Sequence, residues 1–167
     1  DLNVVHEKVL HVFVFDKGLG EFQHIHPEFA DGEWSVEATF ARNGSYLMWA
    51  QGQLQGGDKD FTSNIPLVIN NGSEENPVPP VLTDIRSGSD GLSVATLSGT
   101  RFRAGREAMP NVTFTRTDGT TPVIEPYLGE KAHVVITPSD SHSLIHTHPM
   151  DHGIENQIML HMTFPEP

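Results

Sequence analysis

Hydrophobic and polar residues alternate in short runs along the chain, which is the pattern of β-strands with one buried face. Gly, Asn, Asp and Pro separate these runs. The last run keeps period two through Ile158, Leu160, Met162 and Phe164, so we expect a strand there and not a helix. The pattern predicts strands at residues 10–15, 22–26, 34–40, 46–51, 65–69, 92–97, 111–115, 132–137, 143–147 and 158–164.

The two tryptophans are predicted to lie in hydrophobic cores. A strand at residues 34–40 places Trp34, Val36 and Phe40 on one face. Large aromatic side chains commonly anchor the core of a β-sandwich. We therefore expect both Trp34 and Trp49 to be buried.

One segment of the chain occurs twice at a constant offset of 122 residues. Residues 10–14 and 23–27 form the first copy, and residues 132–136 and 145–149 form the second. Such a repeat indicates two copies of one module. The sequence predicts an all-β protein with two tandem Ig-like or cupredoxin-like β-sandwich modules, at residues 1–72 and 81–167, and a Pro-rich linker at 73–80.

The two modules differ in what precedes and follows the repeated segment. Module one continues through Tyr46, Trp49 and Ile69, whereas module two has a long stretch before its repeat and stops soon after it. This suggests a window cut from a longer two-module protein, truncated at both chain ends. Edge strands left open in this way would pair with another chain and form a homo-oligomer.

What the two copies share is histidine, the commonest ligand of transition metals. The first copy contains His11, His24 and His26, and the second contains His133, His146 and His148.

A hairpin turning between Lys17 and Gly18 would place His11 opposite His24, with His26 on the same face. The same argument places His133 opposite His146. A register slip of two residues would keep each trio on one face. Opposed Cβ atoms lie about 4.5–5.5 Å apart, so the imidazoles can converge on one ion.

Further donors lie near each trio. Met150 and His152 lie in a polar loop and are predicted to complete the second site. A thioether beside imidazoles favours copper, particularly Cu(I). For Met159 and Met162, packing in a hydrophobic core is the simpler interpretation. The remaining candidates are His6, Glu7, Glu28, Met48, His142 and His161.

Composition narrows the functional classes. The net charge is −12 with only 10 Lys and Arg, which argues against a nucleic-acid partner. The absence of cysteine excludes thiolate zinc sites, blue-copper sites, iron–sulfur clusters and disulfides. No apolar run approaches the roughly 18 residues of a membrane-spanning helix.

The segments 6–14, 22–28 and 127–135, together with residues 44–49, resemble modules of secreted bacterial proteins that accompany copper and heavy-metal handling systems. The resemblance covers about half of the chain. It implies tandem Ig-like or cupredoxin-like sandwiches in the periplasm or outside the cell. Module two departs from it, because the Gly-x-Tyr-x-x-Trp segment at residues 44–49 has no counterpart there.

Three functional hypotheses follow. The leading one is an extracytoplasmic protein that sequesters copper, or else zinc, or passes it to a metal-transport or chaperone protein. Neutral imidazoles are required, so binding should weaken below about pH 6. The second is a zinc hydrolase or lyase, with Glu28 or Asp151 as general base. The third is an adhesive or scaffold module whose histidines are structural.

Overall fold

The computed structural model describes residues 1–57, 59–70, 87–99, 102–138, 142–150 and 152–165. These residues form antiparallel strands, turns and loops without any helix, so the predicted all-β class is confirmed. The described part of the chain accordingly contains no helix that could cross a membrane. Contacts divide the chain into a first unit, Asp1–Val81, and a second unit, Leu82–Pro167. The predicted linker at 73–80 lies outside the described residues.

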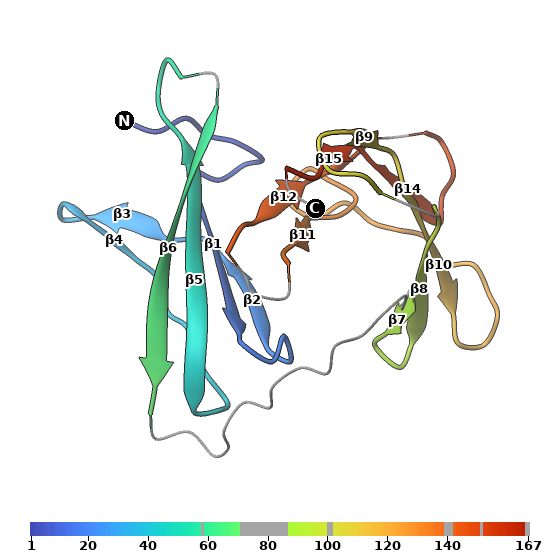
Figure 1. The fold of residues 1–167 in the computed structure, drawn as a ribbon, viewed down its shortest axis with the longest axis horizontal. Helices are drawn as coiled ribbons and strands as arrows, with labels where there is room; N and C mark the ends of the chain where they lie inside the picture. The colour runs from blue at the N-terminus through green and yellow to red at the C-terminus, as the bar shows by residue number, and fades with distance from the viewer. Residues whose placement is uncertain (58, 71–86, 100–101, 139–141, 151, 166–167) are drawn as a thin grey trace. The chain divides into compact units, whose positions relative to one another are not determined.

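The first unit is built on a four-stranded antiparallel sheet with the order β2-β1-β5-β6 (Figure 1). A separate two-stranded ribbon, β3–β4, follows β2. The strands of this unit are β1 (Leu10–Asp16), β2 (Phe22–Ile25), β3 (Glu28–Ala30), β4 (Glu33–Ser35), β5 (Gly44–Gln53) and β6 (Asp60–Ile69).

The second unit contains a five-stranded sheet with the order β13-β14-β10-β8-β7, together with the ladders β11–β12 and β9–β15. All of its pairings are antiparallel. The strands are β7 (Ser87–Ser89), β8 (Ser93–Leu97), β9 (Glu107–Ala108), β10 (Asn111–Arg116), β11 (Val134–Ile136), β12 (Ile145–Thr147), β13 (Pro149–Met150), β14 (Gln157–Leu160) and β15 (Met162–Thr163).

Both strand orders are those of Ig-type sandwiches. The order β2-β1-β5-β6 matches the sheet C′-C-F-G. The strands β13-β14-β10-β8 match the sheet D-E-B-A, to which β7 is added as a further edge strand. Tyr46, near the start of β5, also has the geometry of a tyrosine corner: its hydroxyl lies 2.6 Å from Glu21 Oε2 and 3.2 Å from the Arg42 carbonyl oxygen. In this scheme β1–β2 and β11–β12 are the same C–C′ hairpin, once in each unit.

The core of the first unit lies along β1, whose residues from His11 to Asp16 are all buried. Val12 and Val14 pack with Tyr46 on one face, and Met48 joins this cluster from β5. Because side chains alternate along a strand, His11, Phe13 and Phe15 occupy the other face. The first histidine of the repeat is therefore on the face opposite to the Val12–Tyr46 cluster.

The second unit has its own core around Ile158, Leu160 and Met162, which are at most 6% exposed. Their alternation confirms the period-two interpretation of this segment, although the strand is divided into β14 and β15. The half-buried side chains of Val134, Ile136 and Ile145 pack against this core. The histidine hairpin β11–β12 is thus attached to the core through its apolar residues.

The predicted strand at residues 34–40 is wrong in extent and in burial. Only Glu33–Ser35 is a strand, and Trp34 and Val36 are 40% and 41% exposed. The reason is that β4 pairs with β3 in a two-stranded ribbon, where Trp34 contacts Phe29 with ring centroids 5.2 Å apart. Trp49, in contrast, is 5% exposed, so its predicted burial is confirmed.

Candidate metal centre

The histidine hairpins of the two units have the same register. Phe13 pairs with His24 in β1–β2, and Val135, the counterpart of Phe13, pairs with His146 in β11–β12. The predicted pairing of His11 with His24 is therefore wrong by two residues, as is that of His133 with His146. Continuing each ladder places His11 opposite His26 and His133 opposite His148. A slip of two residues keeps each trio on one face of its hairpin.

The turn after β1 explains the slip. The Asp16 carboxylate accepts hydrogen bonds from the backbone N–H groups of Gly20 and Glu21, at 2.7 and 2.9 Å. Leu19 adopts a left-handed conformation with φ of 52°, and its N–H bonds to the carbonyl oxygen of Asp16. These bonds centre the turn one residue beyond the Lys17–Gly18 position expected from the sequence.

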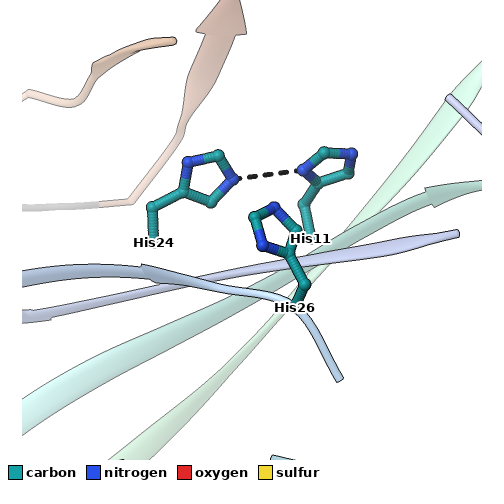
Figure 2. A group of neighbouring side chains, drawn as sticks. All are labelled: His11, His24 and His26. Carbon is teal, nitrogen blue, oxygen red and sulfur yellow. Dashed lines mark hydrogen bonds between the residues drawn. The ribbon is translucent and has the colours of Figure 1, made fainter. Parts of the chain in front are cut away.

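His11, His24 and His26 form the first cluster (Figure 2). One ring nitrogen from each of the three lies within 4.8 Å of the others. His11 Nδ1 lies 3.1 Å from His24 Nε2, and His11 itself is only 3% exposed. The His26 ring centroid is 5.0 Å from that of His11 and 4.6 Å from that of His24.

This geometry fits one transition-metal ion. Nitrogen ligands lie about 2.0–2.1 Å from zinc, so two ligands in a tetrahedral arrangement are about 3.3 Å apart. The 3.1 Å between His11 Nδ1 and His24 Nε2 is close to that value. Within the described residues the group contains three imidazoles and no carboxylate.

His133, His146 and His148 form the second cluster. His133 Nδ1 lies 3.0 Å from His148 Nε2, and the ring centroids of His146 and His148 are 4.4 Å apart. The rings of His133 and His146 are 5.8 Å apart, compared with 5.4 Å between His11 and His24. The structure thus brings together the three histidines of this repeat, with a contact between the first and third instead of the first and second.

The first histidine of each repeat, which we call the leading histidine, is His11 or His133. The hydrogen bond made by the Nε2 atom of each leading histidine was not expected from the sequence. His11 Nε2 lies 3.1 Å from the Val5 carbonyl oxygen, and His133 Nε2 lies 3.0 Å from the Tyr127 carbonyl oxygen. A backbone carbonyl carries no residue-type signature. The sequence therefore contains no signal for these two acceptors.

The other candidate donors occupy varied positions. Met150 lies on β13 opposite Met159 and is 49% exposed, while His152 has a buried Nε2 with no hydrogen-bond partner among the described residues. Met48 and Met162 belong to the hydrophobic cores. His161 is bonded to Glu107, and Asp151 lies outside the described residues.

The chain belongs to a protein family whose model matches residues 1–65 and 87–167. The family is described as a domain of unknown function, DUF8832, so membership assigns no activity. No curated protein and no solved structure matches the chain.

Proposed function

We propose that this chain is an extracytoplasmic transition-metal-binding protein that sequesters copper or zinc, or transfers it to another protein. The observation that carries the proposal is the convergence of His11, His24 and His26, whose ligand nitrogens lie within 4.8 Å of one another. The second cluster has the same register and a 3.0 Å contact between His133 Nδ1 and His148 Nε2, which supports a second site in the same chain.

The donor chemistry supports a transition metal. Imidazole suits Zn, Cu, Fe and Ni, whereas Mg²⁺ and Ca²⁺ prefer oxygen ligands. The first cluster is all-nitrogen among the described residues, and Met48 packs on the opposite face of β1. Copper remains the first choice because divalent copper binds such sites more tightly than zinc does.

The same donor set supports binding over hydrolysis. A zinc hydrolase needs a general base that reaches the metal-bound water. Glu28, the residue considered for that role, has an exposed side chain at the start of β3. The group around His11 contains no carboxylate among the described residues.

The extracytoplasmic location is supported by composition. The chain has no cysteine, so it carries no thiol that an oxidising compartment would modify. The net charge of −12 supports the metal-binding part of the proposal, because it favours the accumulation of cations near the protein surface.

The test is a metal titration of the metal-free, untagged protein with Cu(I), Cu(II) and Zn(II), followed by elemental analysis. We expect near two ions per chain, and near one ion for His24→Ala, because this substitution removes a ligand of the first cluster. His161→Ala is the matched control, since His161 is exposed and paired with Glu107. Unchanged stoichiometry and affinity in His24→Ala would contradict the proposal.

A further inference from the structure

Each histidine cluster is preceded by a tight turn with an uncommon backbone conformation. In Val5–His6–Glu7–Lys8 the two central residues have φ of 49° and 65°, and in Tyr127–Leu128–Gly129–Glu130 they have φ of 49° and 79°. Both turns are closed by reciprocal backbone hydrogen bonds, Val5 with Lys8 and Tyr127 with Glu130. Positive φ at two successive positions is the signature of a type I′ turn.

Three of these four central residues carry a side chain, although the left-handed region strongly favours glycine. Such strain persists only where the surroundings hold it, and it concentrates at functional sites. The repetition of the strained turn at the same distance from the histidine, in both units, indicates that it serves the histidine.

The hydrogen bond between each turn and its histidine determines which ring nitrogen is protonated. A carbonyl oxygen can only accept, so His11 Nε2 must carry the hydrogen that it shares with Val5, and His133 Nε2 the one that it shares with Tyr127. In a neutral imidazole the other nitrogen, Nδ1, then carries the lone pair. In both units this Nδ1 is the atom that faces a second histidine, at 3.1 and 3.0 Å.

We infer that His11 and His133 bind metal through Nδ1, and that the Val5–Lys8 and Tyr127–Glu130 turns are positioning elements that select this nitrogen. The inference rests on the proposed metal-binding function. A metal-bound histidine commonly donates its other N–H to a carbonyl, which fixes the tautomer and the ring orientation. Here the carbonyl also accepts the turn's own N–H bond, so it uses both lone pairs and is itself held in place.

The first test is independent of metal. Long-range ¹H–¹⁵N NMR of histidine-labelled, metal-free protein at neutral pH reports which ring nitrogen is protonated. We expect the Nε2–H tautomer for His11 and for His133. A predominant Nδ1–H tautomer at both would overturn the inference, whatever the protein's metal affinity.

The second test uses two substitutions at one position of the first turn. Glu7→Gly keeps a residue that tolerates positive φ, whereas Glu7→Pro fixes φ near −65° and abolishes the turn. Both remove the same carboxylate, so the comparison isolates the contribution of the main chain. We expect Glu7→Pro to weaken metal binding at the first cluster by about 10–100-fold, the usual effect of losing an outer-shell partner, and Glu7→Gly to bind as the native chain does.

The second cluster provides an internal control. It should keep its affinity in Glu7→Pro, which shows that the second unit stays folded, and native NMR shifts for β5 and β6 should show the same for the first unit. Gly129→Pro should produce the reverse pattern. Equal affinities for Glu7→Pro and Glu7→Gly would overturn the positioning role. If the protein bound no metal, the proposed function would fail while the NMR experiment still decided the tautomer.

Discussion

The two histidine hairpins are local copies in different surroundings. They share the ladder register, the positive-φ turn and the hydrogen bond that fixes the leading histidine. They differ in their neighbours: β1 lies between β2 and β5 in a four-stranded sheet, whereas among the described residues β11 pairs with β12 alone (Figure 1). The repeated sequence therefore determines which three histidines come together, and we expect the neighbouring strand to determine how firmly they are held.

The histidine hairpin of the first unit is also more deeply buried than that of the second unit. His11 is 3% exposed and Phe13 is fully buried, while their counterparts His133 and Val135 are half-buried. Phe13 contacts the His24 ring with centroids 4.6 Å apart, and Trp49 on β5 pairs with Phe13. We therefore expect the first cluster to be the better pre-organised of the two, and pre-organisation increases affinity by reducing the ordering that binding requires.

The largest expected effect comes from removing the aromatic support of the first cluster. Phe13→Ala should lower the free energy of unfolding by about 3–5 kcal/mol, because it leaves a cavity beneath His24. Val135→Ala, at the matching position, should cost only roughly 1 kcal/mol because this residue is half-buried. Denaturant unfolding measures the loss of unfolding free energy in each variant. Equal losses would show that pairing with β5 does not make the first hairpin more tightly packed than the second.

The next effect is the order in which the clusters fill. Substoichiometric Zn²⁺ should shift the NMR signals of His11, His24 and His26 before those of the second cluster, with an affinity about tenfold higher. A histidine-resolved titration measures both steps. Filling of the second cluster first would show that the sheet around β1 gives no advantage in binding.

The smallest expected effect concerns the tyrosine corner of the first unit. Tyr46→Phe removes the hydroxyl that contacts Glu21 and the Arg42 carbonyl, so the free energy of unfolding should fall by about 1 kcal/mol. The Tyr46 ring lies on the face of the sheet opposite to His11, so metal affinity should not change. A fall in affinity without a fall in stability would reverse this assignment of the two faces.

The sequence predicted what depends on local pattern. The all-β class, most of the strands and the single face shared by His24 and His26 follow from residue alternation and from the spacing of the repeat. His11 and His133 also lie beside the other two histidines of their clusters, as expected. The register differs from the predicted one by two residues, which keeps every side chain on the same face of its strand.

What the sequence could not predict depends on backbone detail and on pairing between distant strands. The register required knowledge of the Asp16 bonds to Gly20 and Glu21. The exposure of Trp34 follows from the restriction of β4 to a two-stranded ribbon, which no local pattern reveals. The acceptors of Val5 and Tyr127 are main-chain atoms, which any residue type provides.

The most direct test of the central claim is a crystal structure of the protein loaded with one equivalent of Zn²⁺, with anomalous diffraction at the zinc edge. The account predicts a single strong peak bound by His11 Nδ1, His24 Nε2 and the imidazole of His26, with the His11 Nε2–H still bonded to Val5. Zinc located away from these three histidines, or bound through His11 Nε2, would contradict it.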